Sequence, residues 1–255
     1  VFFPTLEYNG INISYTISDI KSLKRCRHKR IHLKFDTGMH RNALNLDEVD
    51  NILEIAFKKF EVKGVFSHFC CADEFGNDTF IQLDRFKKLR EKVINFCNKN
   101  NYPLPKFHLP NSDAIFKLKE FEMFDYVRPG IAIYGGLDIT GLKPVMSLWG
   151  EKIKTIKILK NQAVGYNKKF IFNKDEIITL IDLGYSDGIL YFDKELQLKE
   201  TKAVGKISMD SMSVIGDFKK VCIFDDIREF VKNYPYTITY DILTKLKAYL
   251  KRIII

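Results

Sequence analysis

The chain has no run of eighteen or more apolar residues, and its opening VFFPTLEYNG carries neither the basic stretch nor the cleavage site of a signal peptide. We therefore expect no membrane span and a cytoplasmic location. The five cysteines are odd in number, and none is spaced as CxxC. The sequence thus predicts neither a disulfide framework nor a metal site.

The sequence also lacks a concentrated basic patch, although its formal net charge is +9. A nucleic-acid surface requires Lys and Arg gathered on one face with aromatic residues between them. Here the lysines are spread through expected helices and strands alike. We therefore expect no nucleic-acid partner. What the sequence does have is 46% apolar residues over 255 positions, enough for one large domain or two modest ones.

The first half of the sequence alternates β-rich runs with helical patterns, which predicts parallel strands joined by right-handed crossovers. The expected strands are INISYT (11–16), IHLKF (31–35), GVFSHF (64–69), KFHL (106–109) and YVRPGIAIYG (126–135). Helices are expected from Ser18 as the candidate cap through Leu23, through 49–60, through 86–96 and from an opening at Asn111 or Ser112. Five strands can form an open sheet, whereas a closed barrel of this type needs eight strands and about 250 residues.

The second half has a different pattern, and the boundary should lie near 136–147. KPVMSLWGEKIKTIKIL alternates apolar and polar residues, and further short strands are expected around 170–172, 177–182, 203–208 and 221–224. This half therefore predicts a β-rich domain. The C-terminal run TYDILTKLKAYLKRIII is compatible with either a helix or a strand.

The segment HLKFDTGMHR (32–41) is the sharpest candidate for chemistry, because a strand carrying Lys34 and Asp36 runs directly into a Gly38 turn. Charged groups at the carboxyl end of a strand are where α/β folds build sites. A buried ion pair beside a turn glycine is the alternative. His68, inside an apolar strand, is a candidate of the same kind, although such a histidine is more often a hydrogen-bonded core residue.

Two further segments favour anion binding. Asn111 and Ser112 open a helix, where free N–H groups attract negative charge, although an ordinary N-cap explains them equally well. Arg128 lies near a strand end, with Gly130 allowing close backbone approach. In eight-stranded barrels the loops after the last two strands commonly bind phosphate, so the two signals support each other. The glycine-flanked VGY, GYSDG and GKISMDSM segments of the second half are predicted to be turns.

Taken together and in order, these motifs resemble the alanine racemase family. The resemblance implies an α/β barrel that binds pyridoxal 5'-phosphate, followed by a C-terminal β domain. In this sequence the domains would be 1–142 and 143–255, with an incomplete (β/α)8 TIM-type barrel of about five strands. The implied reaction is the interconversion of L-alanine and D-alanine, supplying D-alanine for peptidoglycan. A homodimer with shared active sites is also implied.

The resemblance assigns roles to residues of the first half. Arg41 would lie near the substrate carboxylate with Lys34 beneath it, a lysine that is carbamylated in some relatives. Ser112, with Asn111 and the backbone of Gly130 and Ile131, would hold the cofactor's phosphate. Arg128 would face the pyridine nitrogen, and His68 would link this arginine to a catalytic tyrosine. An arginine at the pyridine nitrogen disfavours a decarboxylase, which needs a protonated ring nitrogen.

In the second half, the resemblance makes Tyr166 one of two catalytic bases, acting in the other subunit's active site. Tyrosine titrates near pH 10, so nearby positive charge would be needed for this role. Met209 and Asp210 match a pair beside the substrate, and Tyr185 lies where relatives line the entrance.

The sequence departs from the family at three places. His40 stands where the family usually has glycine. Ala248 aligns with a phosphate-binding tyrosine, and Tyr249 is one position away. The third departure is the largest, because no segment like VKANAYGHG, with the lysine that anchors the cofactor, occurs in these 255 residues. We expect a barrel without its first three strands. A truncated, non-catalytic remnant and a related racemase for serine therefore remain alternatives.

Overall fold

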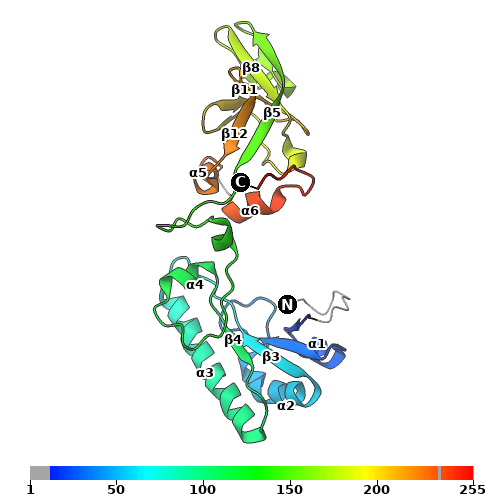
Figure 1. Ribbon diagram of the computed structural model, residues 1–255, viewed down its shortest axis with the longest axis vertical. Helices are drawn as coiled ribbons and strands as arrows, with labels where there is room; N and C mark the ends of the chain where they lie inside the picture. The colour runs from blue at the N-terminus through cyan, green and yellow to red at the C-terminus, as the bar shows by residue number, and fades with distance from the viewer. Residues whose placement is uncertain (1–11, 235–236, 255) are drawn as a thin grey trace. The chain divides into compact units, whose positions relative to one another are not determined.

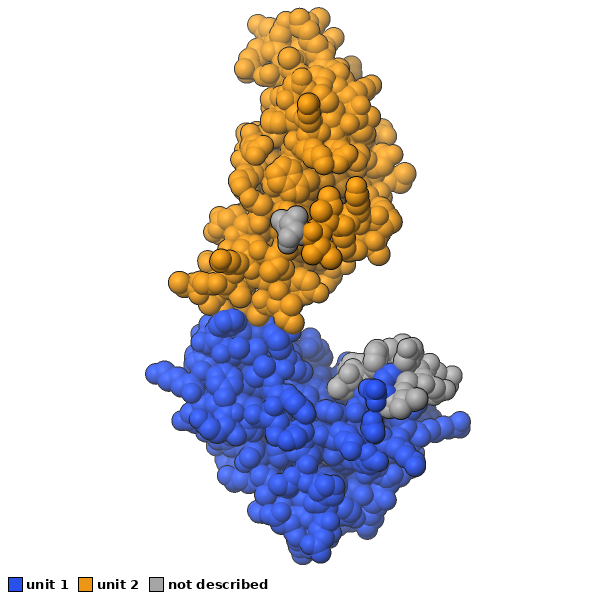
Figure 2. All heavy atoms as spheres, viewed as in Figure 1, with its two compact units in different colours: residues 1–130 blue, residues 131–255 orange. Residues whose placement is uncertain are grey.

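The computed structural model describes residues 12–234 and 237–254, and the chain divides into two compact units, Val1–Gly130 and Ile131–Ile255 (Figures 1 and 2). The start of the predicted strand at residue 11 lies outside the described residues. The two units differ in architecture, because the strands of the first unit's sheet are parallel and those of the second are antiparallel.

The first unit is built on a four-stranded parallel sheet in which the strands are ordered as in the sequence. Its strands are β1 (Tyr15–Ile17), β2 (Arg30–Lys34), β3 (Glu61–Phe66) and β4 (Lys106–His108). The crossovers contain α1 (Ile20–Arg25), the short 3-10 turn η1 (Leu46–Glu48) with α2 (Val49–Lys59), and α3 (Asn77–Asn100), and α4 (Ser112–Lys117) follows β4 (Figure 1). The predicted alternation of strand and helix in the first half is confirmed.

The helix starts follow local capping chemistry. Asp19, rather than Ser18, caps α1, because its carboxylate accepts a hydrogen bond from the Ser22 N–H at 2.8 Å. Asn111 caps α4 in the same way through the Ala114 N–H. The α2 helix buries the apolar face predicted from its periodicity.

The sheet of the first unit has two chemically different faces, because side chains alternate along each strand. One face carries apolar residues that join the core with the helices, among them Ile31, Leu33, Val65 and Phe107. The other face carries His32 and Lys34 on β2, Phe66 on β3 and His108 on β4. The strand order thus brings basic side chains from two strands to one face around Phe66.

Gly64 is required where β3 passes β2. The register shifts between Ile31 and His32, so that Gly64 pairs with His32. A Cβ atom on Gly64 would lie 2.3 Å from the Nδ1 atom of His32. The His32 ring therefore occupies the space that any other residue at position 64 would fill.

The fifth predicted strand, 126–135, contributes only one bridge, between Asn111 and Arg128, and its end forms the 3-10 helix η2 (Ile131–Tyr134). The Arg128 N–H donates to the Pro110 carbonyl at 2.9 Å. Pro129 has no N–H with which to continue the ladder. The sheet pairing therefore stops next to Arg128.

The second unit is β-rich, as predicted. A six-stranded antiparallel sheet has the order β12-β5-β8-β11-β10-β9, and a hairpin pairs β6 with β7. These strands are β5 (Leu148–Ile158), β6 (Ala163–Val164), β7 (Phe170–Ile171), β8 (Glu176–Ile181), β9 (Glu195–Gln197), β10 (Lys202–Val204), β11 (Met212–Ile215) and β12 (Lys220–Phe224). Its short helices are η3 (Tyr166–Lys168), η4 (Tyr185–Asp187), α5 (Ile227–Val231) and α6 (Thr239–Lys245). The C-terminal run is thus helical where it begins.

Candidate active site

The loop after β2 is organised by Asp36. Its carboxylate accepts hydrogen bonds from the Gly38 N–H at 2.8 Å and the His40 N–H at 3.0 Å. These bonds hold His40 at φ +54°, in the left-handed region that glycine adopts most easily. Histidine therefore occupies a turn conformation that favours glycine, with Asp36 fixing its backbone.

Lys34 lies buried beneath this loop and donates to the Arg41 carbonyl at 3.1 Å. Burial, and then the positive charges of Arg41 and Arg128, lower the pKa of Lys34, while Asp36 opposes the shift. The Arg41 residue itself is exposed. The segment is thus an electropositive strand end and not a simple buried ion pair.

Arg128 is the most extensively hydrogen-bonded side chain of the first unit's sheet edge. Its Nη1 atom lies 2.6 Å from His108 Nδ1 and 3.1 Å from the His108 carbonyl. Its Nη2 atom donates to the Ser67 carbonyl at 2.6 Å and the Leu109 carbonyl at 3.2 Å, and lies 3.2 Å from His68 Nδ1. The guanidinium is thereby fixed at the carboxyl ends of β3 and β4.

The imidazoles beside Arg128 are neutral. Burial, followed by the charge of Arg128, lowers the pKa of His68 to about 4 and that of His108 to about 3. Burial lowers the pKa of Arg128 only to about 10, so the guanidinium stays charged at neutral pH. The site therefore contains a permanent cation whose histidine neighbours act as acceptors.

A buried polar layer supports these residues from α3. The Gln82 amide donates to Thr37 Oγ1 at 3.1 Å and to the His68 carbonyl at 3.0 Å, and its Oε1 accepts from the Cys70 N–H. Thr37 and Ser67 share a hydrogen bond of 2.8 Å. The loops after β2 and β3 are therefore tied to each other and to one helix.

Ser112 lies close to the segment that carries Arg128, because its buried hydroxyl accepts a hydrogen bond from the Gly130 N–H at 2.8 Å. Ser112 follows Asn111, which pairs with Arg128 in the single bridge. Four predicted positions, Asn111, Ser112, Arg128 and Gly130, are thus neighbours in the first unit. Ile131, the next predicted position, is buried and begins the second unit.

In the second unit, three glycine-containing loops converge. A Cβ on Gly165 would lie 3.0 Å from the Lys206 N atom, and one on Gly184 would lie 2.3 Å from the Met209 carbonyl oxygen. The Tyr185 N–H donates to the Ser208 carbonyl at 3.1 Å. The segments that carry Tyr166, Tyr185 and Met209 with Asp210 are therefore packed together. Tyr166, Tyr185 and Met209 are exposed by 64%, 45% and 58%, so their side chains are available to a ligand or partner.

Two residues of these clusters were not predicted from the sequence. The sequence predicts His108 only as part of a strand. Its position at the end of that strand, two residues before Pro110, is the feature that could have identified it as a site residue. Tyr249 donates its hydroxyl to Asp187 Oδ1 at 2.9 Å, next to the Tyr185 loop. Because Ala248 has no hydroxyl, Tyr249 is the tyrosine of this C-terminal segment that reaches the cluster.

Among residues 12–234 and 237–254, no group of three or more potential metal ligands is found, and no helix is long and apolar enough to cross a membrane. The first unit is a parallel α/β unit with its polar cluster at the strand carboxyl ends, where α/β barrels build active sites, and an antiparallel β unit follows it in the sequence. Two family models match the chain, the alanine racemase N-terminal domain over residues 8–138 and the alanine racemase C-terminal domain over 145–254. The chain belongs to the alanine racemase family.

Individual relatives agree with the family models. An alanine racemase of Campylobacter curvus is 42% identical over 253 residues, covering 94% of this chain and 73% of the relative. One from Nitratiruptor is 37% identical over 246 residues, covering 93% and 73%. A solved alanine racemase from Bartonella henselae with covalently bound pyridoxal phosphate is 26% identical, with a TM-score of 0.77, covering 94% of this chain and 73% of that one.

Proposed function

We propose that this chain is an alanine racemase polypeptide that interconverts L-alanine and D-alanine with pyridoxal 5'-phosphate. The proposed role is to supply D-alanine for peptidoglycan, in the cytoplasm, as a homodimer with shared active sites. The names of the relatives support the reaction, and the Bartonella henselae structure supports the cofactor. We further propose two domains, 1–142 and 143–255, because the boundary between them falls between the regions that the two family models match.

The arrangement around Arg128 is the observation that carries this proposal. Both Nη atoms of Arg128 are held by acceptors from β4 and the strand ends, so the charged guanidinium has a fixed orientation at the carboxyl ends of β3 and β4. A donor that stays charged and cannot readily give up its proton suits an unprotonated pyridine nitrogen. When bound, the cofactor supplies an electron sink for the charge that develops at the substrate's α carbon.

Ser112 and its neighbours would hold the phosphate. The candidate polar groups of this segment are the Ser112 hydroxyl, whose oxygen accepts from the Gly130 N–H, the Asn111 side chain, which caps α4, and the backbone of Gly130 and Ile131. The Ser112–Gly130 hydrogen bond supports the assignment, since it shows that the two loops approach closely. Pyridoxal phosphate therefore fits the residues present at its phosphate end as well as at its ring nitrogen.

The substrate's carboxylate would be held by Arg41, because an exposed guanidinium binds a carboxylate with two parallel hydrogen bonds. Lys34, which donates to the Arg41 carbonyl, would position that arginine from below. Its lowered pKa favours the neutral amine, the form that reacts with carbon dioxide, which supports carbamylation. Met209 and Asp210 are proposed to lie beside the substrate in the shared active site of the dimer.

Tyr166 would remove or return the α proton on one face of the substrate. Its exposed hydroxyl is available to the active site of a partner subunit. His68 accepts from Arg128 through Nδ1, so its proton lies on Nε2, where it can be donated to a tyrosine oxygen. This orientation supports a link from Arg128 through His68 to the tyrosine. Tyr185 would line the entrance, with Tyr249 beside it.

The proposal is tested on the purified full chain with pyridoxal phosphate, alone and with the part of the Campylobacter curvus relative that lies outside the match. We expect the chain alone to bind the cofactor without a stoichiometric adduct at one lysine when borohydride is added. Racemisation of alanine, faster than that of serine, should appear once the added segment is present. A stoichiometric adduct at one lysine, with robust turnover of the chain alone, would show that a lysine within these 255 residues can anchor the cofactor, contrary to our expectation. Faster turnover of serine, or no turnover with the added segment, would contradict the proposed function.

A further inference from the structure

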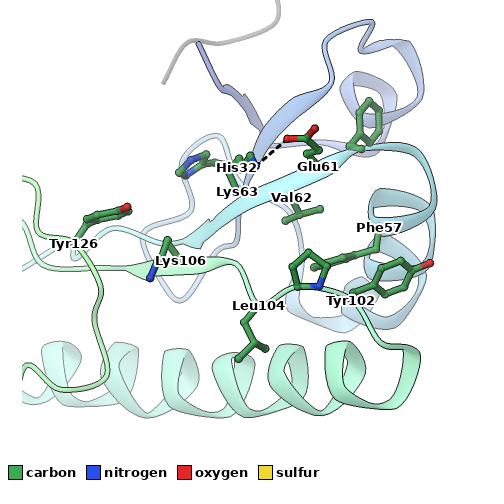
Figure 3. Close-up of a pocket in the computed structure, with 11 residues that line it drawn as sticks. His32, Phe57, Glu61, Val62, Lys63, Tyr102, Leu104, Lys106 and Tyr126 are labelled. Carbon is green, nitrogen blue, oxygen red and sulfur yellow. Dashed lines mark ion pairs between the residues drawn. The ribbon is translucent and has the colours of Figure 1, made fainter. Parts of the chain in front are cut away.

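A second histidine lies behind His108, on the side away from Arg128. His32 Nδ1 is 3.0 Å from His108 Nε2, and the ring centroids are 5.2 Å apart. His32 also lines a cavity of about 690 Å³ together with Glu61, Lys63, Lys106 and Tyr126, shown in Figure 3. The chain Arg128, His108 and His32 therefore runs from the proposed cofactor site to this cavity.

The protonation of this chain follows from the arginine. A guanidinium is a donor only, so His108 Nδ1, at 2.6 Å from Nη1, must accept. A histidine that accepts at Nδ1 is neutral and has its proton on Nε2. His108 Nε2–H must then donate to His32 Nδ1, which leaves His32 neutral with its proton also on Nε2. One cation thus sets the tautomer of both rings.

Packing holds both rings in the planes that these bonds need. The His108 ring stacks on Phe66 with centroids 4.6 Å apart and an interplanar angle of 13°. The His32 ring fills the space above Gly64, where a Cβ would lie within 2.3 Å of Nδ1. Both histidines are buried, at 9% and 4% exposure for His32 and His108. The close contact with Gly64 therefore fixes the orientation of the His32 ring, and the stacking on Phe66 fixes that of the His108 ring.

We propose that His32 is a positioning residue for Arg128, acting through His108. By accepting the His108 Nε2–H, His32 keeps His108 in the tautomer whose Nδ1 accepts from Arg128, and so fixes the guanidinium that would face the cofactor's ring nitrogen. The role for the reaction rests on the proposed function, whereas the arrangement itself does not. Without an acceptor at position 32, His108 can move its proton to Nδ1, where it would oppose the Arg128 N–H.

The charges around His32 favour the neutral form. Arg128 lies beyond His108, whereas Lys106, which lines the cavity, is paired with Asp125 at 2.9 Å. Glu61 is the acidic residue of that cavity lining, and it is paired with Lys63 at 2.9 Å, as the dashed line in Figure 3 marks. A proton added to His32 Nδ1 would meet the His108 Nε2–H and the positive charge of Arg128 beyond it.

The test measures side-chain nitrogen resonances by NMR on the full chain without cofactor, so its result does not depend on racemase activity. In the wild type, His32 and His108 should each show a protonated Nε2 and an unprotonated Nδ1. His32→Leu should cause His108 to lose this single-tautomer pattern and should speed hydrogen exchange at Arg128 Nη. His32→Gln, whose side-chain oxygen can accept from His108, should restore both.

The matched control is His28→Gln, which removes a histidine that stacks on Tyr15, at 3.6 Å between centroids, outside the chain of hydrogen bonds. It should leave the His108 pattern unchanged. A proton on His108 Nδ1 in the wild type would overturn the proposal even if His32→Leu does not fold. So would an unchanged His108 tautomer and unchanged Arg128 exchange in folded His32→Leu. Failure of the racemase assay with the predicted tautomers present would overturn the proposed function alone.

Discussion

The Nη1 atom of Arg128 lies 2.6 Å from the Nδ1 atom of His108, although 20 residues separate them in the sequence. This contact joins the end of β4 to the segment in which sheet pairing stops at Pro129. Arg128 therefore donates hydrogen bonds that stabilise the protein, in addition to the hydrogen bond that we propose it donates to a cofactor. Replacing this residue should therefore affect both stability and binding.

Arg128→Lys should lower the free energy of unfolding by about 2–4 kcal/mol, because a single ammonium cannot serve the carbonyl and imidazole acceptors of two strand ends. Urea unfolding of the variant and the wild type measures this loss. Arg27→Lys, at an exposed position, is the control and should change stability by less than about 0.5 kcal/mol. Equal effects of the two substitutions would show that Arg128 is not a structural donor.

Gly64→Ala should destabilise the protein by about 1–3 kcal/mol, since the added methyl group and the His32 ring cannot occupy the same space. Thermal or urea unfolding gives the value. Gly76→Ala is the matched control, because no atom lies within 4 Å of a Cβ built there. Equal stability of the two variants would contradict the close contact between Gly64 and the His32 ring.

Stability should fall as the pH falls from about 6.5 to about 3. The pKa values of His32, His68 and His108 lie at about 4, 4 and 3 in the folded protein, because burial disfavours the charged form, and at 6.5 when unperturbed. Within this window the unfolded state binds more protons, so acid favours unfolding, and the full stabilisation is present above pH 6.5. Urea midpoints measured across the window test the direction.

His32→Gln isolates one of these groups. Between pH 4.5 and 6 the dependence of unfolding free energy on pH should be shallower than in the wild type by up to about 1.4 kcal/mol per pH unit, the effect of one proton. Between pH 7 and 8, where the imidazole is neutral in both states, the two slopes should agree. A slope unchanged in the acid range would mean that His32 is not buried neutral.

Tyr166→Phe should lower the rate of alanine racemisation by a factor of at least about 10² in the assay with the added segment, because the variant lacks the hydroxyl that we propose as a base. Stability should change by less than about 0.5 kcal/mol because the side chain is 64% exposed. Tyr240→Phe, also at an exposed tyrosine, is the control and should retain activity. Retained activity in Tyr166→Phe would remove this residue from the proposed mechanism.

Lys34→Met should remove a carbamate signal that the wild-type chain is expected to give with carbon-13 bicarbonate in NMR. Burial lowers the pKa of Lys34 and so favours the reactive amine. Lys106→Met is the control, because Lys106 pairs with Asp125 at 2.9 Å. A wild-type chain without the signal, or a signal that persists in Lys34→Met, would contradict carbamylation at this site.

Much of the fold could be predicted from the sequence, because alternation and helical spacing are local properties. The α2 and α3 patterns and the β-rich second half lie where the periodicity indicates. The fifth strand was predicted too long, since its apolar run does not reveal that Pro129 ends the pairing. The sequence favours Ser18 as the cap of α1, whereas Asp19 caps it, because its carboxylate accepts from the Ser22 N–H.

The sequence by itself determined which residue types were available, namely an arginine near a strand end, a serine at a helix start and glycines flanking tyrosines. It did not reveal that Arg128 contacts His68 and His108, because these residues come from different strands and converge only when parallel pairing places their carboxyl ends at one edge. The tertiary structure alone decided the protonation of the histidines. Burial removes the water that would stabilise their charge, and a donor-only guanidinium then dictates which nitrogen carries the proton.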